Sequence, residues 1–483
     1  MQKNSVVKNY VYNLLYQILV IILPLITTPY ISRVLGAENV GIYGYTISIV
    51  TYFTLFGSLG IALYVRREIA YLQDDIEKRS KVFWEFIFLR AITLSVAALI
   101  FYFVFARSGE YSFYYKILLL HIFAAVFDIT AFFQGLEQFK KIIRRNLIIK
   151  IISVSCVFIF IHSPKDLYKY LLIYTLSDLI GNLSLWIDLP KYITGISFGK
   201  LNLFQHIKPT VILFIPQIAT QIYTVLDKTM IGSLIADKAE VGYYEQSQKI
   251  VLTILTVVTS LGTVMLPRMA NKFANGKTDE VKSSITASFR FIFFLAIPMV
   301  FGMISVSPDL IIWFLGKGYA RSIAITQVIS PIILFIGLSN VIGVQYLLPT
   351  MKQKQYTISV VSGALANLVL NFILIPRFMS VGAALATVAA EATVAAVQLF
   401  CIRKEFDIPR IFLMSIKNFI SAIFMSVVIF VVNRYLFAEL GSMALRMVCD
   451  IIIGGIVYVA SLVILRDSFF CKLIGKVFGK LKT

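Results

Sequence analysis

The chain has 483 residues, of which 59% are hydrophobic and only 14% are charged. A soluble protein carries about a quarter charged residues, so this composition excludes an ordinary soluble protein and favours membrane helices, which can be apolar on all sides. The net charge of +20 does not indicate nucleic-acid binding, because the basic residues lie in short loops between apolar blocks, where membrane topology signals are expected.

Apolar blocks follow one another along the chain, each about 20 residues long, which is the length that crosses about 30 Å of hydrocarbon. We predict about fourteen membrane-spanning helices. In chain order they cover 10–31, 40–63, 82–105, 115–135, 147–163, 169–189, 209–232, 243–266, 287–306, 322–346, 355–375, 381–401, 415–434 and 444–465. The first block resembles a signal peptide, but no small-residue cleavage site follows it. We therefore interpret it as an uncleaved helix.

Alternate loops differ in charge. One set carries most of the basic residues, including Arg66, Arg67, Lys140, Lys141, Arg144, Arg145, Arg268, Lys272, Arg403 and Lys404. Loops of this kind face the cytoplasm, so we expect a multi-pass membrane protein with both termini in the cytoplasm. That topology requires an even number of spans, and twelve would satisfy it if two weak blocks were misread.

The sequence carries no pattern that indicates an enzyme or a metal site. Its cysteines, Cys156, Cys401, Cys449 and Cys471, have no disulfide or metal spacing. No loop exceeds roughly 20 residues, and the phosphate-binding loop, nucleophile elbow and zinc-protease motif are absent. We expect no enzyme activity and no cofactor; coupling to protons or sodium ions stays open.

The chain contains an internal repeat with a constant offset of 201 residues. The matching positions are Val40, Gly41, Tyr43, Ile49 and Val50 with Val241, Gly242, Tyr244, Ile250 and Val251. The offset covers an even number of spans, so the halves share one orientation, as in transporters with parallel repeats. We predict a lobe at 1–200, a second lobe at 201–405, and two added helices with a tail at 406–483.

Polar residues form stripes at helical spacing inside several spans. The seventh span carries Gln217, Gln221, Thr224 and Lys228, with Asp227 beside the lysine, and the eighth carries Gln246, Lys249, Thr253, Thr256 and Ser260. Glu245 lies one turn before Lys249, in the favourable orientation for an ion pair. The repeat places Tyr45, Ser48 and Tyr52 of the second span opposite Gln246, Lys249 and Thr253. One lobe thus offers cations and the other offers aromatic hydroxyls.

Charged groups at hydrocarbon depth cost about 2.5–3.5 kcal/mol and usually mark function. Lys228 and Lys249 are therefore candidate substrate-binding residues. Arg90 and Arg290 add cations near the cytoplasmic ends of their spans, where long side chains reach the interface. The alternative is that the Gln, Thr and Ser residues only join helices by hydrogen bonds. Lone acids within the spans, Asp128, Asp178 and Glu391, could serve coupling or buried pairing.

Several stretches resemble a known family. They are PYISRVLGAENVGIYGYTISIV (29–50), RREIA (66–70), FFQGLEQFKKIIRRN (132–146), LDKTMIG (226–232), EVGYYEQSQKIV (240–251), ANLVLNFILIP (366–376) and VGAALATVAAE (381–391). In this order they resemble the Wzx-type polysaccharide repeat-unit flippases of the multidrug/oligosaccharidyl-lipid/polysaccharide exporter superfamily. Arg33, Arg66 and Arg67 match charged positions of the family motifs, and their place near span ends also suits gating or topology.

The resemblance implies an all-α polytopic fold of two six-helix lobes around a central cavity. It implies that the protein lies in the bacterial cytoplasmic (plasma) membrane and moves undecaprenyl-pyrophosphate-linked oligosaccharides to the outer leaflet for capsule, O-antigen or exopolysaccharide assembly. We expect a monomer that binds membrane lipids and works with a polysaccharide polymerase and chain-length machinery. The cavity residues would be Lys228, Lys249, Arg290, Asp227, Gln217, Gln221, Gln246, Tyr45, Ser48 and Tyr52. Arg33, Arg66, Arg67, Arg90 and Glu245 would serve gating or topology.

Three other functions are compatible with parts of the sequence. A drug or cation exporter of the same superfamily would favour acidic cavity residues, whereas these stripes are basic. A polymerase or ligase acting on lipid-linked sugars would need a sizeable outer loop, and the loops are short. A peptidoglycan-precursor flippase would share both the fold and the cations, so the sequence leaves it open.

Overall fold

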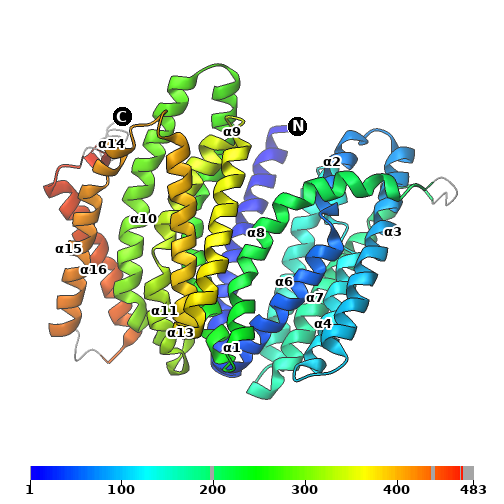
Figure 1. Cartoon of the computed structure of the whole chain (residues 1–483), viewed down its shortest axis with the longest axis horizontal. Coiled ribbons are helices and arrows are strands. Elements are labelled where there is room, and N and C mark those ends of the chain that lie inside the picture. Colours follow the sequence, from blue (N-terminus) through cyan, green and yellow to red (C-terminus); the bar gives the residue numbers. More distant parts are fainter. Residues whose placement is uncertain (1, 196–200, 437–440, 468, 472–483) are drawn as a thin grey trace. The chain divides into compact units, whose positions relative to one another are not determined.

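The computed structural model describes residues 2–195, 201–436, 441–467 and 469–471, except for the side chains of 2–22, 212–213, 215–223 and 263–264. The described residues are helical almost throughout and contain no strand. The α-helices are α1 (Gln2–Ser58), α2 (Ile61–Tyr71), α3 (Ile76–Phe101), α4 (Ser112–Val126), α5 (Thr130–Gly135), α6 (Phe139–Phe160), α7 (Leu167–Trp186), α8 (Ile207–Leu234), α9 (Ala239–Ala274), α10 (Thr278–Leu315), α11 (Arg321–Ile329), α12 (Ile332–Ser339), α13 (Gln353–Ile402), α14 (Ile408–Leu413), α15 (Ile416–Tyr435) and α16 (Met443–Ile464). Figure 1 shows their course.

Ten helical segments of the described chain are long and apolar enough to cross a membrane. Two long helices, α1 and α13, each cover parts of two predicted spans and bend between them, at Gly36 (φ 76°) and at Met379 (φ 53°). Two further predicted spans fall on α6 and α8, which lie outside those ten segments. The all-α polytopic membrane fold is confirmed, and its helices fit fourteen spans.

The chain forms two compact units, Met1–Gly242 and Tyr243–Thr483. In the first unit α8 packs against α1 and α2, while α1 also packs against α3 and α4. Its core includes Val50, Leu94, Phe101 and Leu118, which are fully or almost fully buried. The predicted lobe boundary at 200 follows the sequence repeat and stays a prediction.

In the second unit α10 packs against α12, α15 and α16, and α13 packs against α11 and α12. The two C-terminal helices, α15 and α16, lie side by side along α10 (Figure 1). The second unit therefore contains α15 and α16, the two helices that the sequence places outside the repeat, and both pack against α10.

A reciprocal backbone contact supports the repeat. A Cβ added to Gly41 would lie 1.7 Å from Lys238 O, and a Cβ added to Gly242 would lie 2.1 Å from Ala37 O. Gly41 and Gly242 are 201 residues apart, and so are Ala37 and Lys238. Each glycine thus packs against the backbone of the residue that lies four positions before the other glycine. Such close approach requires glycine at both positions.

Candidate functional site

A chain of hydroxyl groups joins the second part of α1 to α8 in the first unit. Thr229 Oγ1 lies 2.9 Å from Ser48 Oγ and 3.2 Å from Tyr52 Oη, and the Ser48 hydroxyl donates to Tyr45 O at 2.7 Å. The structure thus brings together the three residues predicted on this face of α1. The sequence did not predict Thr229 as a site residue. The polar stripe predicted on α8 ends at Lys228, and Thr229 lies on a different face of the helix.

Tyr45 also packs at the C-terminal end of α8. Its hydroxyl lies 3.5 Å from Ser233 Oγ, and its ring lies against Gly232, where an added Cβ would come within 2.2 Å. Lys238 Nζ lies 5.2 Å from the ring centroid and donates to Gly232 O at 2.5 Å. The lysine therefore satisfies a carbonyl that the helix end leaves open and adds a cation–π contact. Lys238 is a second residue that the sequence reasoning missed.

The polar stripe of α9 lies in the second unit. Lys249, Thr256 and Ser260 are exposed, and the Thr253 hydroxyl donates to Lys249 O at 2.7 Å. The Thr256 and Ser260 hydroxyls likewise donate to carbonyls of their own helix, which satisfies serine and threonine within a helix. An exposed lysine cannot face hydrocarbon cheaply, so this face suits contact with water or a polar ligand.

The other predicted cavity residues have different surroundings. Asp227 is buried at 3% exposure, and Lys228 is half-buried on α8. Gln246 is buried, and its Oε1 has no hydrogen-bond partner among the described residues. The side chains of Gln217 and Gln221 lie outside the described residues. Because Lys228 and Lys249 belong to different units, their shared cavity stays a prediction.

Arg290 lies on α10 with its Nε 3.2 Å from Met414 Sδ, just beyond α14. Sulfur is a weak acceptor, so this contact leaves the guanidinium able to bind a stronger one. Glu245 is half-buried on α9, one turn from Lys249, and the predicted pair stays a prediction.

The predicted gating or topology arginines of the first unit also differ from one another. Arg33 and Arg66 are exposed. Arg67 pairs with Glu68 at 2.9 Å and lies 5.0 Å from the Tyr64 ring centroid. These exposed cations suit topology or interfacial roles, since an exposed pair contributes little stability.

Arg90 does not reach out to the interface, as its position near a span end had suggested. It is 8% exposed, its Nη1 donates to Asp128 O at 2.6 Å, and its Nη2 lies 3.7 Å from Asp128 Oδ2. The description of Asp128 and Asp178 as lone acids is therefore wrong. Asp178 Oδ2 lies 3.0 Å from His121 Nδ1, and Glu391 also takes part in a polar or electrostatic interaction.

Asp128 sits at a break between α4 and α5. The break frees backbone carbonyls, and side chains satisfy three of them: Asn182 donates to Ala124 O at 2.9 Å, Trp186 to Phe127 O at 2.8 Å, and Arg90 to Asp128 O. Non-helical backbone at membrane depth is tolerated only when protein or water satisfies it. This arrangement gives Arg90 a structural role in the first unit.

The segment before α8 is fixed by a buried histidine. His206 Nε2 lies 2.8 Å from Glu85 Oε2, and Asn202 N donates to Glu85 Oε1 at 2.7 Å. Glu85 is fully buried and His206 is 6% exposed. The cluster ties the entry of α8 to α3, and it was missed because the partners lie more than 100 residues apart.

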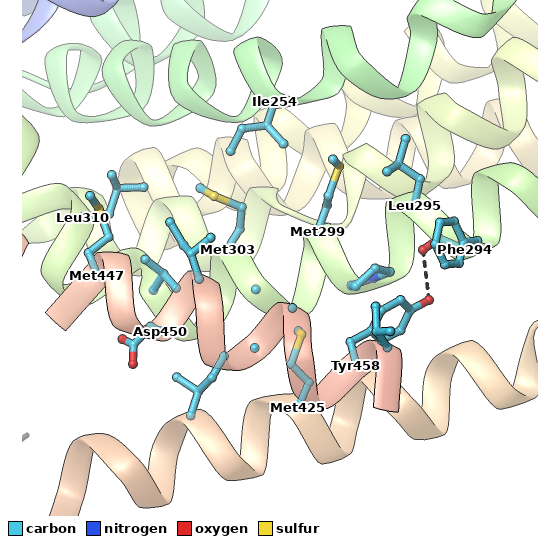
Figure 2. A pocket seen from close by; sticks show the side chains of 18 residues that line it. Ile254, Phe294, Leu295, Met299, Met303, Leu310, Met425, Met447, Asp450 and Tyr458 are labelled. Atoms are coloured by element: carbon cyan, nitrogen blue, oxygen red, sulfur yellow. Dashed lines mark hydrogen bonds between the residues drawn. The ribbon is translucent and has the colours of Figure 1, made fainter. Parts of the chain in front are cut away.

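An apolar cavity of about 560 Å³ opens among α9, α10, α15 and α16 (Figure 2). Met303 and Met425 line its middle, Tyr458 lies at one end, and Asp450 and Met447 lie at the other. The Tyr458 hydroxyl donates to Phe294 O at 2.9 Å. Most of the lining side chains are apolar, and the volume lies in the range of small-molecule sites. The cavity therefore suits an apolar ligand.

Two family models match overlapping parts of the chain. The model of the family described as "Polysaccharide biosynthesis protein" matches residues 6–273, and that of "Lipid II flippase MurJ" matches residues 170–449. A protein of Escherichia coli (strain K12) named "Putative O-antigen transporter" is 24% identical over 417 residues, which cover 83% of this chain and 98% of that protein. The lipid II flippase MurJ of Bacillus subtilis (strain 168) is 26% identical over 222 residues, covering 44% of this chain and 41% of that protein.

Solved structures show the same fold. The lipid II flippase MurJ in an inward closed conformation superposes with a TM-score of 0.76 at 18% identity, covering 95% of this chain and 99% of that one. An inward-facing multidrug transporter of the MATE family superposes with a TM-score of 0.62 at 10% identity, covering 79% and 93%. With more than half of its residues matched by the first family model, the chain belongs to the polysaccharide biosynthesis protein family, the polysaccharide flippases of the multidrug/oligosaccharidyl-lipid/polysaccharide exporter superfamily.

Proposed function

We propose that this flippase moves undecaprenyl-pyrophosphate-linked oligosaccharide repeat units from the inner to the outer leaflet by alternating access. The observation that carries the proposal is the exposed Lys249 on the polar face of α9. A pyrophosphate needs cations, and a sugar needs hydroxyl and aromatic partners such as those around Tyr45 and Tyr52. The relatives named as O-antigen transporters support the same substrate class.

Each part of the substrate would use a different surface. Lys249 and Lys228 would bind the pyrophosphate, with Arg290 as a further cation. The oligosaccharide would contact Gln246 and the hydroxyl chain of α1. Capsule, O-antigen and exopolysaccharide precursors share this architecture, so the proposal covers all three. Coupling to a proton or sodium gradient would supply the driving force, since the chain has no nucleotide-binding motif.

A second candidate is export of the peptidoglycan precursor, which the match of residues 170–449 to the MurJ family model favours. This lipid also carries a pyrophosphate and would use the same cations. The two functions differ in which lipid-linked sugar accumulates in the cell when the protein is lost. Loss of a drug exporter would cause neither lipid to accumulate.

The experiment deletes the gene and follows lipid-linked sugars in both leaflets. We expect complete repeat units to accumulate in the inner leaflet and surface polysaccharide to disappear. Restoration by the wild type and by Lys249→Arg, but not by Lys249→Ala, would tie transport to the cation. Lys282→Ala, on an exposed lysine near the start of α10, is the matched control.

Normal surface polysaccharide with new drug sensitivity would contradict the proposal. Accumulation of the peptidoglycan precursor would replace it with the second candidate. If Lys249→Ala restores transport fully while membrane insertion is unchanged, the assignment of Lys249 to the substrate is wrong.

A further inference from the structure

A buried carboxyl group on α16 has fewer partners than its chemistry requires. Asp450 is 1% exposed, and its Oδ2 accepts a hydrogen bond from Asn433 Nδ2 of α15 at 2.8 Å. Its Oδ1 is buried and has no hydrogen-bond partner among the described residues. Asp450 also borders the apolar cavity, but Figure 2 shows its carboxyl oxygens turned away from Met303. The carboxyl group therefore belongs to the contact between α15 and α16.

Asn433 has the complementary deficit. Its Nδ2 donates to Asp450, while its Oδ1 is buried and has no hydrogen-bond partner in the described part of the chain. The two side chains thus share one hydrogen bond, and each has one further oxygen that needs a donor. Buried acceptors without a donor are rare in native proteins, because they lose hydration without compensation. A donor is therefore missing from this contact.

The neighbouring arginine does not supply that donor. Arg446 precedes Asp450 by four residues on α16, and its Nη2 lies 3.8 Å from Asp309 Oδ1 of α10. Its Nε is buried without a hydrogen-bond partner among the residues that the structure describes, so this N–H does not donate to Asp450. The ion pair of Arg446 is therefore with Asp309.

An ionised Asp450 would leave a net negative charge inside the protein. The charged groups around it are Arg446 of α16 and Asp309 of α10, whose charges cancel. The helices α15 and α9 present the neutral side chains of Asn433 and Ile254. A charge at membrane depth that no counterion compensates is costly. The surroundings therefore favour the neutral, protonated form of Asp450.

We infer that Asp450 binds a proton at neutral pH and that its Oδ1–H donates to Asn433 Oδ1. A protonated carboxyl group has one O–H donor and keeps an acceptor oxygen, and a primary amide has both an N–H donor and an acceptor oxygen. Asn433 Nδ2 already donates to Asp450 Oδ2, so the second hydrogen bond closes a planar acid–amide pair. One proton taken from water thus satisfies both orphaned oxygens and brings no net charge into the membrane.

The proton site lies near one membrane surface. Asp450 lies about 10 Å along α16 from its first residue, Met443, at 1.5 Å per residue. The side chains of Arg446 and Asp309 are 23% and 21% exposed, so the proton would exchange with water past them. Loss of the proton would break the hydrogen bond to Asn433 and weaken the contact between α15 and α16. The inference does not rest on the transported substrate, because none of these residues belongs to the predicted substrate site.

The test is infrared spectroscopy of the purified full-length protein in liposomes at pH 7. The wild type should show the carbonyl band of a protonated carboxylic acid, which shifts in deuterium oxide, and Asp450→Asn should remove that band. Asn433→Leu should move the band to higher frequency, because the carbonyl loses the hydrogen bond from Nδ2. Asp178→Asn, on a membrane acid of the first unit, is the control and should keep the band.

A second measurement follows the melting temperature. The amide of Asp450→Asn can donate to Asn433 Oδ1 as the protonated acid does, so the melting temperature at pH 7 should change little. Asp450→Leu has no donor there and should melt at a lower temperature. Between pH 7 and pH 10 the wild type should lose more stability than Asp450→Asn, because the folded state must release its proton.

Three results would overturn the inference. A wild-type spectrum at pH 7 without the acid band, or a band that persists in Asp450→Asn, would show that Asp450 is ionised. An unchanged band in Asn433→Leu would show that the two side chains do not pair in this way. Loss of the band on addition of sodium chloride at constant pH would assign the site to a sodium ion. If Asp450→Asn does not fold, the wild-type band and its shift in Asn433→Leu still decide the outcome.

Discussion

At the scale of single residues, the sequence predicted chemistry better than contacts. Periodicity placed Tyr45, Ser48 and Tyr52 on one face of α1. The structure joins Ser48 and Tyr52 through the Thr229 hydroxyl, and the Ser48 hydroxyl donates to the backbone carbonyl of Tyr45. The sequence did not predict Thr229 or Lys238 as their partners. Helical spacing defines one face of a helix but cannot say which neighbouring helix packs on it.

The close approach of Gly41 to Lys238 O predicts strong sensitivity to one added carbon. Gly41→Ala should lower the free energy of unfolding by about 1–3 kcal/mol or more, because backbone atoms must move to relieve the overlap. The melting temperature in detergent measures this. Gly455→Ala, where the added carbon meets open space, should leave it unchanged or raised, since alanine favours the helix. Similar melting temperatures for wild type and Gly41→Ala would contradict the contact.

A second prediction concerns Glu405, outside the membrane-spanning segments, which hydrogen-bonds to Lys352 and Tyr346. Burial raises the pKa of Glu405, but the hydrogen bonds from Lys352 and Tyr346 outweigh burial and lower the pKa overall. The carboxylate therefore adds stability that is complete above its unfolded pKa of about 4.3 and is lost as pH falls through the folded pKa.

This effect is measured by melting between pH 7 and pH 3. The wild type should lose more stability across that range than Glu405→Gln, whose amide does not titrate. Lys352→Met should also lose less stability than the wild type between pH 7 and pH 3, because it removes a partner that lowers the pKa of Glu405. Parallel melting curves for wild type and Glu405→Gln would show that this cluster does not contribute to the acid sensitivity.

At the scale of elements, hydropathy located the helices and the bends that separate adjacent spans, but it missed a break inside one span. The bends at Gly36 and Met379 fall between predicted spans. The break between α4 and α5 falls within the predicted span 115–135 and was not expected. Hydropathy reports transfer into lipid over about 20 residues. Hydropathy does not detect a break in a helix when side chains distant in sequence satisfy the freed carbonyls. Here Asn182 and Trp186 donate to those carbonyls.

The break predicts a strong coupling between Arg90 and Asp128. Arg90 is buried, whereas the Asp128 side chain is 34% exposed, so water partly compensates the carboxylate when the arginine is removed. Arg90→Met should destabilise the protein by about 1–3 kcal/mol, the cost of a lost hydrogen bond to a charged group, and Asp128→Asn in the same chain should restore part of the loss. A double-mutant cycle on the melting temperature measures the coupling. Additive effects of the two substitutions would contradict a direct pair.

At the scale of the whole molecule, the repeat was the most informative feature of the sequence. It predicted two halves of like orientation, which stays a prediction, and it aligned Gly41 with Gly242, two glycines that pack reciprocally on backbone in the structure. The apolar cavity was not predicted, because it forms where α15 and α16 pack against α9 and α10, more than 100 residues earlier in the chain. Membership of the polysaccharide flippases indicates that the molecule as a whole transports a lipid-linked polysaccharide across the membrane.

The most direct test of this account is translocation by the purified protein in liposomes that carry a fluorescent undecaprenyl-pyrophosphate oligosaccharide. The fraction accessible to a membrane-impermeant quencher reports movement between leaflets. The account predicts rapid exchange with the wild type and with Lys249→Arg, and at least tenfold slower exchange with Lys249→Ala, since one charge-assisted hydrogen bond contributes about 1.5–3 kcal/mol. Exchange no faster than in protein-free liposomes for the wild type, or equal rates for wild type and Lys249→Ala, would contradict it.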